Sequence, residues 1–315
     1  MAEACTPLER LRGLVASGEL ELAPPGRGTT PERHRILYGL GREDVALARL
    51  AEAHLDAVSI LAEAGRAPAK GAIYGVWASE GGGVRLKLEE SEEGLRLAGA
   101  KRFCTGAGLV DRALVVAETP TGPRLVDAGL TASGVDADSS DWATSAFAAT
   151  ATGTMRFDDV HVPATALVGE PHWYADRAGF WMGAVGPAAC WAGGASGLVD
   201  AAWKGRRGVP HGDAHLGALR ALAWANLALL DAAGREMDEA PDGPTTVHQA
   251  RALQVRHLVE RACTEIIDRF GRATGPRLLA FDGDIARRHA ELSLYLLQCH
   301  GERDLETLAQ AVSGD

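Results

Sequence analysis

The spacing of apolar residues changes twice along this chain of 315 residues, and this change limits the folds open to it more than any other feature. Across residues 42–65 apolar side chains recur every three or four positions, which places them on one face of an α-helix. Across about 71–168 short apolar runs alternate with charged residues and are separated by Gly, Pro and Asp, which predicts short β-strands. The helical spacing returns beyond residue 172, so the pattern predicts an α+β fold.

We therefore predict three zones, namely a helical segment over 1–70, an antiparallel β domain over 71–168 and a four-helix bundle over 169–315. No helical pattern interrupts the predicted strands, which disfavours a doubly wound parallel sheet. The last zone holds the most regular apolar stripe of the chain, at residues 248–271.

Charge and cysteine usage exclude several classes of protein. The net charge of −10 argues against a nucleic-acid partner, because phosphate binding needs a basic surface. The five cysteines are scattered, which argues against a disulfide framework or a zinc site and indicates a reducing, cytoplasmic environment. The N-terminus lacks the apolar core of a secretion signal, and no apolar run has the length of about 18 residues expected of a membrane span.

His211 and His215 have the four-residue spacing of metal ligands on a helix. The surrounding stretch VPHGD is typical of a turn, and Asp213 suits the N-cap of the helix that follows. We therefore predict no metal site.

The stretch GAKRFCTGAG at residues 99–108 places an aromatic ring, a thiol and a hydroxyl beside three small residues. Glycine is preferred where the backbone bends sharply or closely approaches a ligand. Taken alone, this stretch favours a β-turn in which Phe103 belongs to the core and Thr105 caps a strand. Its meaning depends on the segments around it.

Four segments, in this order, resemble motifs of the acyl-CoA dehydrogenase family, the flavoproteins that oxidise acyl thioesters. They are YGVWASEGG (74–82), GAKRFCTGAG (99–108), MRFDDVHVPATALVGE (155–170) and IIDRFGRATG (266–275). The resemblance spans roughly residues 45–300 and implies the fold of that family. This fold has a middle antiparallel β domain and a C-terminal four-helix bundle, with an N-terminal helical domain that is short here.

The resemblance also implies FAD as the cofactor, bound against the strands that carry the first two motifs. A flavin ring is flat and apolar on its faces, and its polar edge needs short hydrogen-bonding groups. In this interpretation Phe103 packs against the ring, the hydroxyls of Ser79 and Thr105 bond its edge, and Cys104 lies beside them. Arg207, in a shortened hairpin, and Gly271, in a Phe-Gly turn between the last two bundle helices, contact the rest of the cofactor. Family members usually form a homodimer or homotetramer, which we expect here.

The implied reaction is α,β-desaturation of an acyl thioester, which needs a carboxylate base to remove a proton. Glu291 is the nearest match to the family's base, although its spacing also suits an ion pair with Arg287 or Arg288. Two alternatives remain open because the base is ambiguous and the N-terminal domain is short. One is a flavin-dependent monooxygenase of the same fold acting on another small molecule, and the other is a binding or scaffold member that holds no flavin.

Overall fold

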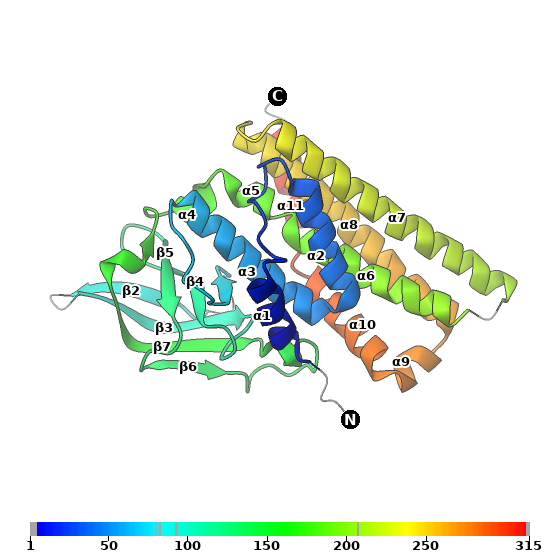
Figure 1. The fold of residues 1–315 in the computed structure, drawn as a ribbon, viewed down its shortest axis with the longest axis horizontal. Helices are drawn as coiled ribbons and strands as arrows, with labels where there is room; N and C mark the ends of the chain where they lie inside the picture. The colour runs from blue at the N-terminus through cyan, green and yellow to red at the C-terminus, as the bar shows by residue number, and fades with distance from the viewer. Residues whose placement is uncertain (1–4, 80, 82, 92–93, 207, 313–315) are drawn as a thin grey trace. The chain divides into compact units, whose positions relative to one another are not determined.

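The computed structural model describes residues 5–79, 81, 83–91, 94–206 and 208–312. The chain forms two compact units (Figure 1). The first contains the chain up to Pro24 together with Ala53–Phe180, and the second contains Pro25–Glu52 together with the chain from Trp181. Helix α3 (Val45–Glu63) begins in the second unit and ends in the first. The N-terminal zone of the sequence is thus shared between the two units.

The first unit is built around two four-stranded sheets within the described residues (Figure 1). One sheet has the strand order β1-β4-β5-β8 and the other the order β2-β3-β7-β6. The strands are β1 (Tyr74–Trp77), β2 (Leu86–Ser91), β3 (Gly94–Cys104), β4 (Arg112–Ala117), β5 (Arg124–Gly129), β6 (Val135–Asp138), β7 (Gly153–Val162) and β8 (Leu167–Val168). The unit also contains α1 (Pro7–Ser17), α4 (Trp173–Asp176), η1 (Ala148–Thr150) and η2 (Ala164–Ala166).

The strand pairs in both sheets are antiparallel except for β1 and β4, which run parallel. The two sheets meet where β2 lies beside the end of β4. There the Glu118 N–H donates to Leu86 O and the Leu88 N–H donates to Glu118 O, each at 2.9 Å. These bonds tie the sheets together along one edge.

The C-terminal half of α3 covers the sheet that contains β1. A buried cluster joins the helix to this sheet through Ala57, Ile60, Leu61, Tyr74, Leu114, Val116, Leu125 and Val168. Gly65 ends the helix in the left-handed conformation, with φ of 69°, and the Arg66 N–H returns to Leu61 O at 2.8 Å. This cap fixes the backbone of Arg66 and therefore the starting point of its side chain.

The second unit is a helical bundle (Figure 1). Its helices are α2 (Thr30–Glu43), α6 (Gly186–Lys204), α7 (Pro210–Glu239), α8 (Thr245–Thr274), α9 (Arg277–Phe281), α10 (Gly283–Leu296) and α11 (Glu302–Val312). The division of the chain after Phe180 falls within α5 (Gly179–Gly183). The antiparallel pair α7 and α8 is the longest in the bundle (Figure 1).

Small residues allow α2 and α6 to approach closely. A Cβ added to Gly41 would lie 2.4 Å from Cys190 O, and one added to Gly193 would lie 2.1 Å from Tyr38 O. Asp238 at the end of α7 then fixes the start of α2, because its carboxylate accepts the Thr30 N–H at 2.9 Å and the Thr30 hydroxyl at 2.6 Å. The Ala- and Gly-rich sequence of α6 predicts this close packing.

The α+β fold predicted from the sequence is confirmed. One local prediction was wrong, because Gly271 lies inside α8 and not in a turn. The helix continues there because Phe270 is fully buried and Arg272 pairs with Asp268 one turn earlier. The helix ends instead at Gly275, whose φ of 67° lies in the left-handed region.

Candidate functional site

Phe103 occupies a strained position at the end of β3. The pairing of β3 with β7 shifts register between Lys101 and Cys104, which is the signature of a β-bulge. Within this bulge Phe103 has φ of 57°, a region that costs a residue with a Cβ about 1–3 kcal/mol. The ring is nevertheless 53% exposed. The fold therefore holds an aromatic side chain out of the core at a local energetic cost, a pattern concentrated at functional sites.

A pocket of ≈ 180 Å³ opens beside this ring, with walls from the end of β3, the β6–β7 connection and the start of β7. Trp142 meets Phe103 edge to face, with ring centroids 6.2 Å apart and planes at 83°. Asp141 accepts a hydrogen bond from the Thr154 hydroxyl at 3.2 Å and pairs with Arg102 at 3.6 Å. The pocket thus combines two aromatic walls with a polar edge.

Glycine at position 81 leaves room for the Phe103 ring. A Cβ added there would lie 2.6 Å from the ring, closer than side-chain atoms come to one another. A larger residue at this position would therefore displace the ring.

The turn that follows Phe103 is held by bonds from two neighbouring segments. Trp77, at the end of β1, donates its indole N–H to Thr105 O at 3.0 Å. The Gly106 N–H donates to Thr150 O in the β6–β7 connection at 2.8 Å. The end of β1, the end of β3 and this connection therefore form one rigid local arrangement.

The structure places three of the predicted cofactor residues around this arrangement. Phe103 is exposed, Thr105 is only 8% exposed, and Ser79 is exposed just beyond the end of β1. Cys104 is different, because its side chain is fully buried and its thiol donates to Lys101 O at 3.2 Å. Burial raises the pKa of this thiol to about 12, so Cys104 offers a ligand only its backbone groups.

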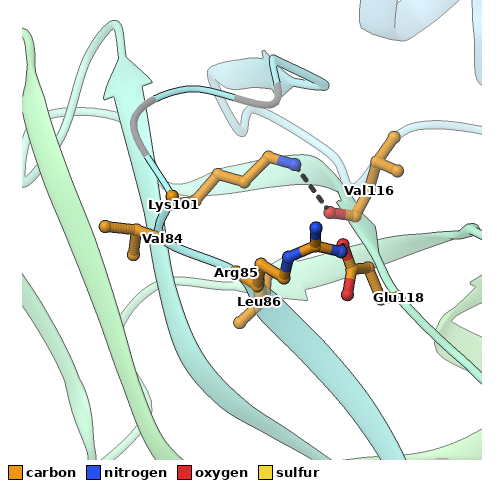
Figure 2. Close-up of a pocket in the computed structure, with 7 residues that line it drawn as sticks. Val84, Arg85, Leu86, Lys101, Val116 and Glu118 are labelled. Atoms are coloured by element: carbon orange, nitrogen blue, oxygen red, sulfur yellow. Dashed lines mark hydrogen bonds and ion pairs between the residues drawn. The ribbon is translucent and has the colours of Figure 1, made fainter.

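Lys101, in the same strand, lines a second pocket of ≈ 150 Å³ (Figure 2). Its ammonium donates to Val116 O at 3.0 Å, which links β3 of one sheet to β4 of the other. Arg85 and Glu118, which also line this pocket, pair at 2.6 Å. The bond from Lys101 anchors β3 to the other sheet at the residue where the register shift begins.

Glu291 belongs to the second unit, where it is fully buried within α10. Its carboxylate accepts a hydrogen bond from Arg287 at 3.1 Å, and Arg287 also pairs with Asp44 at 2.8 Å. The ion pair that the helical spacing suggested is therefore present. A carboxylate in this position has no exposed surface through which to meet a substrate.

The chain was compared with known families, curated proteins and solved structures. No protein-family model matches it, and no curated protein matches its sequence. Solved structures do match over nearly the whole chain. The FMN-bound TdsC of Paenibacillus sp. A11-2, a dibenzothiophene monooxygenase, superposes with a TM-score of 0.79 at 16% identity, covering 96% of this chain and 94% of TdsC.

Two further structures show the same likeness. KijD3, solved in complex with FMN and a dTDP-linked amino-keto sugar, gives a TM-score of 0.78 at 16% identity, covering 98% of this chain and 91% of KijD3. The nitrososynthase of Micromonospora carbonacea var. africana gives a TM-score of 0.76 at 16% identity, covering 92% of this chain and 84% of the other. The chain has the acyl-CoA dehydrogenase fold.

Gly271 and Arg207 were predicted to contact the part of FAD beyond its flavin ring. Gly271 is part of helix α8, so its backbone N–H is not presented by a turn. Arg207 lies outside the described residues. Its neighbour Arg206 forms an ion pair with Asp213 at 2.7 Å. Asp213 itself lies in the first turn of α7 and is not the N-cap that the sequence suggested, because the helix already begins at Pro210.

Sequence reasoning missed Arg102, Asp141 and Trp142, which line the pocket beside Phe103. The stretch SSDWATS gives only a weak signal, a single tryptophan in a polar connection. No group of three or more potential metal ligands was found in the part of the chain that the structure describes.

Proposed function

We propose that this chain is a flavin-dependent oxidoreductase whose flavin ring packs against Phe103. The exposed ring of Phe103, held in a strained bulge beside a pocket, is the observation that carries this proposal. The fold supports it, because TdsC and KijD3 were both solved with FMN.

The residues present fit such a ring. Phe103 offers an apolar face and Trp142 a second aromatic wall beside it. Thr105 would bond the polar edge of the ring, with its position set by the Trp77 bond to its carbonyl. A bound flavin supplies a hydride acceptor or, once reduced, the means of activating molecular oxygen. The protein's part is to orient the ring and exclude water from one of its faces.

We propose FMN as the cofactor in place of the FAD that the family resemblance implies. The resemblance assigned the adenine half of FAD to Gly271 and its pyrophosphate to Arg207. Gly271 is helical, which removes the turn on which half of that assignment rested. FMN needs neither contact.

We further propose that the reaction is an oxygenation. Desaturation of an acyl thioester requires a base at the substrate, and Glu291 is fully buried in an ion pair with Arg287. Oxygenation needs no such carboxylate, and the neighbours TdsC and nitrososynthase are named for oxidative chemistry of this kind. Desaturation remains the second candidate, carried by the sequence motifs.

Flavin binding and the reaction type are tested by separate measurements. The purified protein, titrated with FMN and then with FAD, is expected to quench the fluorescence of FMN and to bind it more tightly than FAD. With reduced FMN and oxygen, indole or dibenzothiophene is expected to gain an oxygen atom, detected by mass spectrometry. A protein that takes up neither flavin would contradict the proposal and leave the scaffold alternative. Conversion of acyl-CoA thioesters to enoyl-CoA products would establish desaturation instead.

We also propose that the chain forms a homodimer through the outer face of α7. By length and composition alone, this helix is apolar enough to cross a membrane. Only 28% of its most apolar stretch is buried, so much of that apolar surface is exposed in a single chain. Trp224 on α7 is 73% exposed and Trp203 on α6 is 48% exposed, and Arg220, one turn before Trp224, lies 6.0 Å from the Trp203 ring. Exposed apolar patches of this kind usually mark protein interfaces.

Trp224→Glu is expected to convert the protein to a monomer, because it removes the exposed ring and adds a carboxylate that is costly to remove from water in an apolar interface. Size-exclusion chromatography with light scattering measures the mass directly. Lys87→Glu, on the exposed face of β2, is the matched control and is expected to leave the dimer intact. Equal masses for the Trp224 variant and the parent would refute this interface.

A further inference from the structure

A third pocket of the first unit, of ≈ 250 Å³, shares no lining residue with the pocket beside Phe103. Its walls come from the start of β4, the end of β5, the end of β7 and the residues after it, together with Arg66 just past the end of α3. Segments distant in the sequence thus meet around one concave surface.

Two arginines and one carboxylate form the charged side of this pocket. Asp127 is 6% exposed and accepts hydrogen bonds from Arg112 Nε at 2.8 Å and from Arg66 Nη2 at 3.4 Å. Two positive charges and one negative charge leave one positive charge in surplus. Each arginine side chain remains 30% exposed, so the surplus charge is partly desolvated and partly open to a ligand.

Both guanidinium groups are held in place before any ligand arrives. Arg66 donates through Nη1 to Leu167 O at 3.1 Å, and Arg112 donates through Nη2 to Asp127 O at 3.0 Å. The N–H groups that these bonds leave over can donate to the oxygens of a carboxylate. Binding to guanidinium groups that are already held in place requires little side-chain ordering, which lowers the cost of association.

The lining also offers exposed apolar groups, Ala132 from the connection after β5 and Pro163 after β7, beside the polar His161 and Thr165. Val160 and Val162 lie behind them and are buried. An inorganic anion would leave Ala132 and Pro163 facing water, whereas a short hydrocarbon group would cover them. The site therefore suits a ligand with one negative charge and a small apolar part.

We propose that this pocket binds a small organic monocarboxylate, with its carboxylate on Arg66 and Arg112 and its hydrocarbon part against Ala132 and Pro163. The site is independent of the flavin and of the proposed reaction. Its occupant neutralises the surplus charge and stabilises the first unit by mass action.

Propionate is the probe, titrated into the full chain while heat release and the melting temperature are followed. Saturable binding with a rise in melting temperature is expected, whereas propylamine, of similar shape and opposite charge, is expected to give neither. Arg66→Gln is expected to weaken propionate binding by about tenfold or more, since it removes a charge-assisted contact. Arg85→Gln, which removes an exposed arginine elsewhere in the same unit, is the matched control and is expected to bind like the parent.

Ala132→Leu tests the site without altering its charge. Ala132 is exposed, so a leucine fills the pocket with little risk to folding and is expected to abolish propionate binding. The proposal is overturned if propionate does not saturate, if the Ala132 or Arg66 variant binds it like the parent, or if phosphate binds equally well. Flavin absorbance of the same samples reports on the proposed function separately, so failure of one is distinguishable from failure of the other.

Discussion

Phe103→Gly is expected to remove most of the affinity for FMN while leaving the protein more stable than Phe103→Ala does. In an ordinary strand glycine is less stable than alanine by about 0.5–1 kcal/mol, because it loses more backbone entropy on folding. At φ of 57° the order reverses, since alanine keeps the steric cost of the left-handed region and glycine does not. We expect glycine to be the more stable of the two by about 1 kcal/mol, measured by chemical denaturation of the flavin-free protein.

The loss of affinity has a different origin. Both substitutions remove the aromatic wall, and stacking of a flat heterocycle on an aromatic side chain contributes about 1–3 kcal/mol. The dissociation constant of FMN is therefore expected to rise about tenfold or more in both variants, while Phe103→Tyr, which keeps the ring, stays close to the parent. Unchanged FMN affinity in the glycine variant would remove Phe103 from the site. A stability order of alanine above glycine would show that the bulge relaxes without the ring.

Periodicity predicted the main elements because it reports directly on which face of each element is buried. The apolar stripe of residues 248–271 became α8, and the alternation near residue 86 became β2. Strand β6, with the exposed acidic sequence VDAD, and the two-residue strand β8 carry no such pattern. The parallel pairing of β1 with β4 depends on contacts between distant segments, which no local spacing records.

In the candidate site, too, residues with a local sequence signal were predicted, and features that depend on contacts between distant segments were not. Phe103 and Thr105 stood out because glycines beside an aromatic residue and a hydroxyl form a local signal. The strain at Phe103 was not foreseen, because it arises from a register shift against β7. Asp141 and Trp142 reach the pocket only through the fold of a long connection. Their sequence contains nothing that distinguishes a site from an ordinary loop.

The burial of Glu291 was hidden for the same physical reason. The spacing in α10 indicated an ion pair with Arg287 but gave no reason to expect Asp44, which lies 243 positions away from Arg287. Asp44 and Glu291 share one arginine, and this network belongs to the packing of the second unit. A carboxylate used for packing and one used as a base look identical in a sequence.

Glu291→Ala is expected to lower the free energy of unfolding by about 3 kcal/mol, measured by chemical denaturation. Removing one partner of a buried ion pair costs about 3–5 kcal/mol. The lower end applies because Arg287 is 36% exposed and keeps its bond to Asp44. The double variant Glu291→Leu/Arg287→Leu is expected to lose less stability than the sum of its single variants, by about 1–2 kcal/mol, because it leaves no charge unpaired between them.

The isosteric variant Glu291→Gln separates packing from catalysis. Glutamine keeps the shape and one hydrogen bond but loses the charge, so the melting temperature is expected to fall while flavin affinity and oxygenation per folded molecule stay within about twofold of the parent. A catalytic base behaves in the opposite way, because removal of a general base lowers turnover by about 100- to 10,000-fold without requiring a loss of stability. Acyl-CoA desaturation that the parent performs and that collapses in a fully stable Gln variant would restore Glu291 as the base and desaturation as the reaction.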